Sequence, residues 1–461
     1  MVAIPRLVLA APSSGAGKTT VTVALAHALA ARGLRVALFK CGPDYLDPTY
    51  HARVAGAPSH NLDGWMMGKD AARTTFAHAA RDADVALVEG MMGLFDGASP
   101  AGEESSTAEL AKWLEAPVVL VVDASGMARS LAALVHGFDS FDPALRVAAV
   151  IANRVGGASH LELLRYAQES PPILGGLPDD PGHAFPERHL GLLTADEATL
   201  PDALIEHWGK QASAWLALDA LLDVARSAPP LPTAESEVAA RTVAACRIGV
   251  AKDAAFHFYY ADNLRRLERL GAELVPFSPI VDRQLPDVDG LYFGGGYPEA
   301  FARQLAANEP MRAAVRAFAE HGGPVYAECG GLMYLARAIA TVDGERHPMV
   351  GLVPAEARMC KTLQALGYVE VETRTRTILG DAGTRFRGHR FRYSELSAPA
   401  PSTIHAYSVR ARRDGEVTPE GYVVRNVVAS YVHAHWASNP GVAAALVRAC
   451  ASFREARRSP R

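Results

Sequence analysis

The chain has few cysteines, and they follow no recognisable pattern. Its 461 residues include five, at positions 41, 246, 329, 360 and 450. They are scattered and odd in number, and no pair has the spacing of a metal-ligand motif. We therefore expect neither a disulfide scaffold nor a zinc site.

Long apolar runs and blocks of like charge are also missing. No stretch is long enough to cross a bilayer, and residues 1–9 lack the features of a signal peptide. The formal net charge is -4, without a long basic run. These features disfavour nucleic acid and an acidic membrane surface as partners, and they predict a cytoplasmic location.

The length predicts more than one domain, because 461 residues exceed one ordinary hydrophobic core. Proline and small polar residues gather after residue 226, and residues 247–251 then read as the start of a fresh buried strand. We predict a first domain over 1–226, a linker over 227–243 and a second domain over 244–461.

Both halves have the pattern of α/β proteins. Short continuous apolar runs, which indicate strands buried on both faces, alternate with helical segments. These runs are 7–11, 36–40, 85–89, 118–123, 147–153, 248–251, 290–294 and 325–328. Helices are predicted at 20–32, 262–270, 310–321 and from 440 onward, and the chain after about Val350 is more β-like, for example at 368–372 and 428–433. The expected fold is a mostly parallel sheet followed by a second α/β domain.

A phosphate-binding loop is predicted at residues 11–20, APSSGAGKTT, between a strand and a helix. Its glycines let backbone N–H groups curl around phosphate, Lys18 adds positive charge, and the Thr19 hydroxyl can ligate magnesium. Pro12 replaces the first glycine of the usual pattern. The candidate ATP-binding residues here are Ser14, Gly15, Ala16, Gly17, Lys18, Thr19 and Thr20.

Four acidic residues follow predicted strands of the first half. Glu89 ends one strand, and Asp96 comes shortly after it. Asp44 and Asp47 directly follow another strand. Each alone also suits a turn or a helix cap. Because the carboxyl ends of parallel strands face the nucleotide crevice, the set predicts a site for metal and for an acyl-phosphate reaction.

Cys329 is predicted to lie at a sharp turn between a strand and a helix, in residues 324–335, PVYAECGGLMYL. The adjoining glycines permit a strained elbow, and the following helix start is expected to lower the thiol pKa and favour thiolate. Backbone N–H groups of Gly330 and of glycines 294–296 are candidate donors to an oxyanion. We take Cys329 as the nucleophile rather than a buried structural cysteine.

A cysteine nucleophile needs a base, and His433 and His435 are the candidates. In an extended strand both point to the same face, so their spacing does not choose between them. No glutamate follows two residues after either histidine to act as a third triad member. His435 itself holds that position relative to His433.

These residues together resemble the cobyrinate a,c-diamide synthase family, and the resemblance covers nearly the whole chain. The segments that carry it are 11–20, 40–51 (KCGPDYLDPTYH), 88–97 (VEGMMGLFDG), 292–299 (YFGGGYPE) and 328–331 (ECGG). In that family a P-loop domain similar to dethiobiotin synthetase precedes a class I glutamine amidotransferase domain of the cobyric acid synthase type. That type keeps the Cys–His pair but lacks the usual glutamate.

The resemblance implies ATP- and glutamine-dependent amidation of the a and c acetate side chains of cobyrinate, with Mg²⁺ as cofactor. Its partners would be a corrinoid tetrapyrrole, ATP and L-glutamine, and a homodimer is a possible assembly. The family pattern falls on residues 431–434 and favours His433 as the base. The roles it suggests are Mg²⁺ binding by Thr19, Glu89 and Asp44; positioning of metal, nucleotide or substrate carboxylate by Asp44, Asp47 and Asp96; adenine recognition by Asn153; and an oxyanion hole from Gly295 and Gly330.

Two rivals stay open at this point. A partition-type ATPase switch would carry a second lysine early in the phosphate loop, where this chain has Ser13, and would lack the cysteine elbow. A sister synthetase acting on hydrogenobyrinate or nickel-sirohydrochlorin would share every feature above. An amidotransferase half that serves only as a scaffold is disfavoured by the presence of Cys329 and His433.

Overall fold

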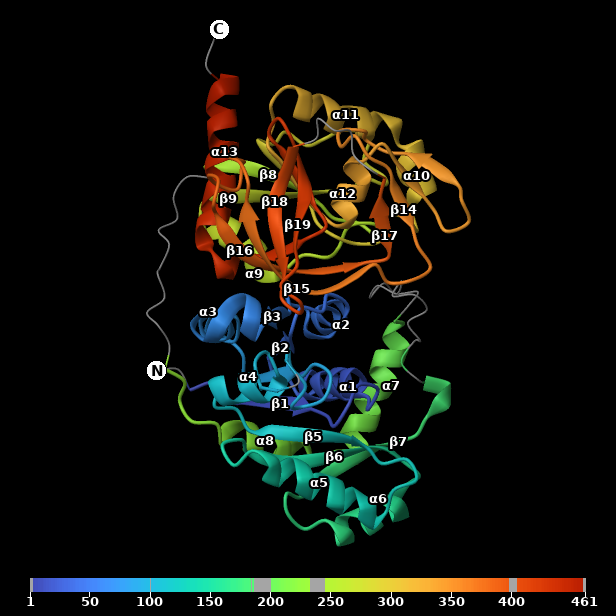
Figure 1. Ribbon diagram of the computed structural model, residues 1–461. Coiled ribbons are helices and arrows are strands. Elements are labelled where there is room, and N and C mark those ends of the chain that lie inside the picture. Colours follow the sequence, from blue (N-terminus) through green and yellow to red (C-terminus); the bar gives the residue numbers. More distant parts are fainter. Residues whose placement is uncertain are drawn as a thin grey trace. The chain divides into compact units, whose positions relative to one another are not determined.

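The computed structural model describes residues 3–99, 101–183, 185, 200–232, 245–397 and 404–458. The chain divides into two compact units, Met1–Glu237 and Val238–Arg461 (Figure 1). Among the described helices, none combines the length and apolar character that a membrane crossing requires.

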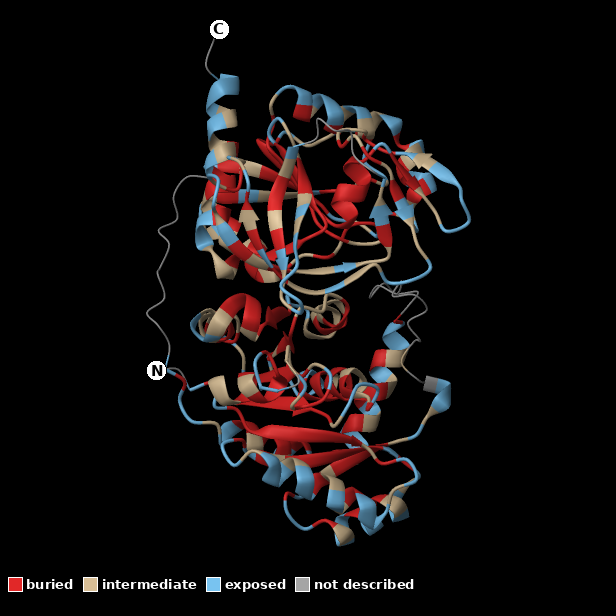
Figure 2. Cartoon of the chain, in the orientation of Figure 1, coloured by how far each residue is buried: buried red, intermediate tan, exposed pale blue. Residues whose placement is uncertain are grey.

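The first unit contains a seven-stranded sheet in which every pairing is parallel, with strand order β3-β2-β4-β1-β5-β6-β7. All residues of β1 and β4 are buried, as continuous apolar runs predict for a sheet that helices cover on both faces (Figure 2). Its elements are β1 Arg6–Ala10, α1 Lys18–Ala31, β2 Val36–Cys41, α2 Leu46–Ala55, β3 His60–Leu62, α3 Gly64–Ala79, β4 Val85–Glu89, α4 Thr107–Trp113, β5 Val118–Asp123, α5 Arg129–Phe141, β6 Val147–Val155, α6 Ala158–Ala167, β7 Ile173–Pro178, the 3-10 turn Pro181–His183, α7 Asp202–Trp215 and α8 Leu218–Arg226.

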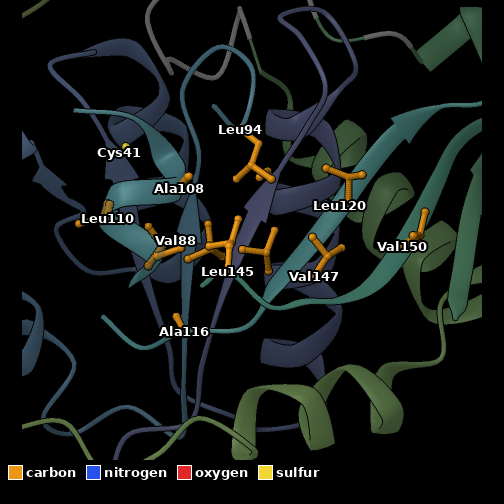
Figure 3. Close-up of a cluster of buried hydrophobic side chains, with 14 of the residues drawn as sticks. Cys41, Val88, Leu94, Ala108, Leu110, Ala116, Leu120, Leu145, Val147 and Val150 are labelled. Carbon is orange, nitrogen blue, oxygen red and sulfur yellow. The ribbon is translucent and has the colours of Figure 1, made fainter. Parts of the chain in front are cut away.

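The core of this unit lies beside the central strands. Figure 3 shows part of it, with Val88, Leu120 and Val150 from three strands and Leu110 from α4. Cys41 belongs to the same cluster and is buried, and burial raises the pKa of its thiol to about 12. Cys41 is therefore a small apolar core residue.

The second unit contains a ten-stranded mixed sheet with strand order β21-β16-β15-β18-β19-β20-β11-β10-β8-β9, and a smaller four-stranded sheet, β13-β12-β14-β17. In the large sheet the strands from β9 to β20 in that order pair in parallel, and the remaining pairs are antiparallel. The elements are β8 Cys246–Ala251, α9 Ala261–Arg269, β9 Ala272–Phe277, β10 Gly290–Phe293, α10 Ala302–Ala307, α11 Glu309–Glu320, β11 Val325–Glu328, α12 Gly330–Leu335, β12 Ala338–Ala340, β13 Arg346–Pro348, β14 Ala357–Met359, β15 Ala365–Thr373, β16 Arg385–Arg392, β17 Ser394–Leu396, β18 Ile404–Ala411, β19 Val417–Val424, β20 Val427–Ser430, β21 His433–His435, the 3-10 turn Trp436–Ser438 and α13 Pro440–Arg458.

The predicted strands and helices are found within a few residues of their expected bounds, with one exception. The run 428–433 was predicted to be one strand, and that prediction is wrong: β20 ends at Ser430 and β21 begins at His433. β20 pairs with β11 and β19, whereas β21 pairs with β16 at the far end of the sheet. The histidines therefore lie on a separate short strand.

The start of the predicted linker packs on the first unit. Leu231 is buried, and the Pro229 carbonyl accepts a 2.7 Å hydrogen bond from the Arg6 guanidinium. Residues 233–243 of the predicted linker lie outside the described residues.

Candidate active sites

The phosphate loop of the first unit joins the buried strand β1 to the helix α1. Gly17 immediately precedes α1 with a φ of 90°, a left-handed conformation that glycine adopts without steric cost. A Cβ at Gly17 would lie 2.1 Å from Nδ2 of Asn153, so the close approach also requires glycine. The first residues of α1, Lys18 and Thr19, consequently point their functional groups toward the end of the sheet.

A cavity of about 810 Å³ opens at this loop. The predicted site residues that line it are Ser14, Gly15, Gly17, Lys18, Thr19, Thr20, Asp44, Asp47, Glu89 and Asn153. Ala16 and Asp96 are not among its lining residues. Ala16 instead presents its carbonyl to Nδ2 of Asn153 at 3.0 Å, which ties β6 to the loop.

Lys18 is held toward this cavity by backbone carbonyls. Its Nζ donates to the carbonyls of Ser13, at 3.2 Å, and Met92, at 2.5 Å. Burial, followed by the nearby positive charge of Lys40, lowers the pKa of Lys18 to about 8. A phosphate in the cavity would offset both effects and favour the charged ammonium.

Glu89 is the centre of a buried polar cluster. Its Oε1 accepts from the Thr19 hydroxyl at 2.8 Å and from Nζ of Lys40 at 2.9 Å, and its Oε2 lies 2.6 Å from Nε2 of His51. Nζ of Lys40 also lies 2.7 Å from Oδ2 of Asp47. Burial opposes the charge on Lys40, but Asp47 and Glu89 outweigh it and raise the pKa of Lys40.

The pair of Thr19 and Glu89 fits a Mg²⁺ site. Mg²⁺ commonly takes one or two protein oxygens and completes its shell with phosphate oxygens and water. The hydroxyl and the carboxylate are already within 2.8 Å of one another at the phosphate loop. Among the described residues there is no cluster of three or more His, Cys, Asp or Glu that would bind a metal without such help.

The remaining acidic residues make local hydrogen bonds. Oδ1 of Asp44 accepts from the backbone N–H of Leu46 at 3.0 Å, while Asp44 still lines the cavity. Oδ2 of Asp96 accepts from the N–H of Gly93 at 2.8 Å, which is the turn role that any Asp can fill. Asp96 nevertheless acts electrostatically on Lys18.

In the second unit Cys329 lies between β11 and α12 as an elbow. Its φ of 47° and ψ of -102° are strained for a residue with a Cβ, a cost that persists only where surroundings enforce it. The N–H of Cys329 donates to the Ser430 carbonyl at 2.7 Å. A Cβ at Gly330 would lie 2.9 Å from Cδ of Pro298, and one at Gly331 2.5 Å from the Phe293 carbonyl, so both glycines are needed for this packing.

The thiol is more buried than the sequence suggests. Cys329 is 8% exposed, and its Sγ donates to the Phe391 carbonyl at 3.7 Å. Burial first, and then the charge of Glu299, raise the pKa of Cys329 to about 12, although the N–H of Gly330 acts in the opposite direction. The prediction of a lowered pKa is therefore wrong, because the short helix α12 does not outweigh burial.

The two histidines of β21 meet different neighbours. Cε1 of His433 lies 2.5 Å from the position that a Cβ on Gly295 would take, so the imidazole packs directly on the glycine loop. Burial, and then His389 on the paired strand, lower the pKa of His433 to about 3. The His435 ring instead packs 4.8 Å from the Tyr260 ring. This arrangement favours His433 as the base.

The glycine loop 294–296 also meets the start of α12. The Gly330 Cβ position would be 3.1 Å from the backbone N of Gly296, and the Gly330 N–H faces the Cys329 sulfur. The Gly295 N–H, in contrast, donates to the Phe258 carbonyl at 3.2 Å. This contact does not support the prediction that Gly295 binds an oxyanion, whereas the Gly330 N–H already faces the sulfur.

Comparison with known proteins gives matches over both units. A CobQ/CobB/MinD/ParA nucleotide binding domain matches residues 7–192, and a CobB/CobQ-like glutamine amidotransferase domain matches residues 247–441. A curated cobyrinate a,c-diamide synthase from Leptospira interrogans serogroup Icterohaemorrhagiae serovar copenhageni (strain Fiocruz L1-130) is 50% identical over 448 residues, covering 97% of this chain and 98% of the relative. The chain belongs to the cobyrinate a,c-diamide synthase family.

A second family relative, from Syntrophotalea carbinolica, is 49% identical over 452 residues, with 97% of this chain and 98% of the relative covered. A solved structure described as a glutamine amidotransferase covers 44% of this chain and 98% of its own, at 20% identity and a TM-score of 0.32. That score is too low to carry an argument. The α/β fold class, a P-loop domain followed by an amidotransferase domain, is confirmed.

The sequence analysis did not single out several buried polar residues near the candidate sites of this cobyrinate a,c-diamide synthase family member. Lys40 is the penultimate residue of the otherwise apolar strand β2, and a lysine in that position signals a buried charge with partners. Glu328, directly before the cysteine, accepts from Tyr326 at 2.7 Å, Tyr292 at 3.1 Å and the Ala434 N–H at 3.1 Å. It thereby fixes the strand that carries the histidines.

Further missed residues lie around the first-unit cavity, where aromatic rings form one wall. Phe185 lines the cavity, and so does Trp208, which belongs to α7. Their rings stack, with the centroids 5.4 Å apart and an angle of 7° between the ring planes. Arg154 lines it as well and pairs with Asp123. These positions come together only in the folded sheet, so spacing along the chain gave no signal.

We predict that nucleotide binding weakens as the pH rises above about 8, because Lys18 then loses the proton that attracts phosphate. The contribution of Lys18 is fully present below that pH and falls by up to about tenfold per pH unit above it. Calorimetry with a non-hydrolysable ATP analogue, in two buffers of different ionisation enthalpy, would show a rising Kd and proton uptake. Lys18→Arg, which stays charged, is the control. A wild-type Kd that is constant up to about pH 10 would contradict the prediction.

We predict that Cys329 is alkylated slowly at neutral pH and that the rate keeps rising through about pH 10, because the free thiol has a pKa of about 12. Iodoacetamide labelling of the Cys360→Ser variant, read at Cys329 by peptide mass spectrometry, gives the profile without interference from the half-buried Cys360. A rate that reaches its plateau below about pH 7 would show a preformed thiolate instead.

Proposed function

We propose that this protein amidates the a and c acetate carboxylates of cobyrinate, using ATP for activation and glutamine as the nitrogen source. The observation that carries the proposal is one chain with a phosphate loop bearing Lys18 and a strained elbow bearing Cys329. The two nearly full-length relatives described above carry the name of this activity.

The glutaminase reaction belongs to the second unit. Because the free thiol has a raised pKa and His433 a lowered one, both groups are neutral at rest. His433 therefore takes the thiol proton as the sulfur attacks the side-chain amide of glutamine, and it gives that proton to the departing ammonia. The N–H groups of Gly330 and Gly296 stabilise the oxyanion. Water then hydrolyses the thioester and regenerates the thiol.

The synthetase reaction belongs to the first unit. A free carboxylate is a poor acyl donor, so its oxygen first takes the γ-phosphoryl group of ATP, and ammonia then displaces phosphate. The loop N–H groups and Lys18 bind the phosphates and stabilise the charge that develops on them. Mg²⁺, held by Thr19 and Glu89, would neutralise phosphate charge when bound.

Lys40 and the nearby aspartates organise the substrate side of this cavity. Lys40 lines the cavity while its charge is balanced by Asp47 and Glu89, so it provides a fixed positive charge beside the phosphate loop. Asp44 and Asp47 are proposed to position metal or substrate, and Asp96 to act on Lys18 through its charge. Asn153, which lines the same cavity, is proposed to contact adenine.

The choice of cobyrinate rests on the relatives' name, and hydrogenobyrinate and nickel-sirohydrochlorin would undergo the same chemistry. A partition-type switch is disfavoured because the amidotransferase match extends over residues 247–441. A cytoplasmic location and a homodimeric assembly stay predictions. Incubating the protein with each macrocycle, ATP and glutamine would identify the substrate by the mass of the amide product.

We predict that Cys329→Ala loses glutamine-dependent amidation by at least about a thousandfold, because no other group forms the thioester. Amidation with free ammonium should stay within about twofold of wild type, since the first unit is unchanged. Both rates are measured with cobyrinate and ATP by mass spectrometry of the product. The control Cys360→Ser should keep both activities. Retention of glutamine use by Cys329→Ala would refute the assignment of the nucleophile.

A further inference from the structure

The last residues of β16 lie beside the nucleophile. The Cys329 sulfur donates to the carbonyl of Phe391, 3.7 Å away, and the next residue is Arg392. The guanidinium of Arg392 lies 4.7 Å from the centroid of the Tyr431 ring, and it also donates to the Ser394 carbonyl. Tyr431 directly follows Ser430, whose carbonyl binds the Cys329 N–H. These contacts hold a positive charge next to the elbow.

Arg392 forms no salt bridge among the residues that the structure describes, although Glu420 lies near enough to interact with it electrostatically. Glu420, a half-buried carboxylate of the same region, already accepts hydrogen bonds from the Ser430 hydroxyl and from the Tyr431 N–H at 2.7 Å. Arg392 is half-buried, and its charge acts on Cys329. A partly desolvated guanidinium without an anion is costly unless a ligand supplies one.

A carboxyl group, that of Glu299, also acts on the Cys329 sulfur. Glu299 follows Pro298, the residue that packs against Gly330 at the start of α12. Within the described part of the chain, Glu299 has no cationic partner, and burial raises its pKa to about 7. The sulfur is thus acted on by one cation and one carboxyl group, and neither forms a salt bridge within the described part of the chain.

The ligand that suits this pair carries an anion and a cation at one end and a reactive amide at the other. We propose that Arg392 and Glu299 bind the two charged groups of the glutamine zwitterion, Arg392 the α-carboxylate and Glu299 the α-ammonium. The inference rests on the proposed glutaminase reaction at Cys329, and it identifies what selects an α-amino acid for that reaction. Bidentate pairing suits a guanidinium and a carboxylate, whereas a single carboxylate suffices for an ammonium.

Glutamine analogues that lack one charge separate the two contacts. Glutaramate lacks the α-ammonium, and 4-aminobutanamide lacks the α-carboxylate. Arg392→Gln should raise KM roughly 30-fold for glutamine and glutaramate and leave KM for 4-aminobutanamide within about twofold. Glu299→Gln should raise KM for glutamine and 4-aminobutanamide but not for glutaramate. Arg392→Lys, which keeps the charge but not the fork, should recover part of the loss.

Matched controls distinguish recognition from structural damage. Arg385→Gln removes an exposed guanidinium from the other end of β16 and should leave all three KM values unchanged. Ammonium-dependent amidation should be unaffected in every variant. Equal KM increases for all three substrates, or none, in both Arg392→Gln and Glu299→Gln would overturn the inference. If Cys329→Ala abolishes glutamine use while these variants behave as wild type, only this inference fails and the proposed function stands.

Discussion

Both proposed sites depend on a residue with a positive φ directly before a helix. At Gly17 the turn, with a φ of 90°, directs the loop N–H groups and Lys18 toward the cavity. Cys329 has a φ of 47°, and its sulfur lies 3.7 Å from the Phe391 carbonyl. Glycine adopts such a conformation freely, whereas cysteine does so at a cost of about 1–3 kcal/mol, which the surrounding packing must offset. Parallel strands ending at one edge of a sheet provide that packing in each case.

Buried charges hold the residues around these turns in place. In the first unit Lys40 lies between Asp47 and Glu89, and Thr19 and His51 complete the hydrogen bonds of Glu89. In the second unit Glu328 accepts a hydrogen bond from the N–H of Ala434, the residue between the two histidines. Nδ2 of Asn263 donates to the Ala434 carbonyl at 2.7 Å. Removing one member of such a network leaves a buried polar group unpaired, which costs free energy. Both networks therefore fix the positions of the side chains that they contain.

The sequence was most informative where a local pattern decides local structure. The apolar runs located the strands, and the glycines beside Lys18 and Cys329 located the two turns, because both features act within a few residues. The split of 428–433 into β20 and β21 was missed because it depends on which distant strand each piece meets. The prediction of a lowered thiol pKa failed for a similar reason, since burial of Cys329 arises from the tertiary fold.

Among the site residues, too, those with a local sequence pattern were predicted and those that depend on distant partners were not. Lys18, Thr19 and Glu89 were predicted, and they line one cavity. Lys40, Glu328 and Arg392 were not, because their roles depend on partners far away in sequence. Gly295 was predicted from its triple-glycine motif, yet its N–H donates to Phe258, a contact that only the bridge between two loops creates.

The central claim is that a carboxylate activated with ATP is captured by nitrogen released from glutamine. One labelling experiment with the intact protein tests it most directly, using cobyrinate whose carboxylates carry oxygen-18 together with glutamine labelled with nitrogen-15 in its amide. Mass spectrometry should find one oxygen-18 in phosphate and one nitrogen-15 in the corrinoid for each amide formed. Phosphate without the heavy oxygen, or product without the heavy nitrogen, would contradict the account.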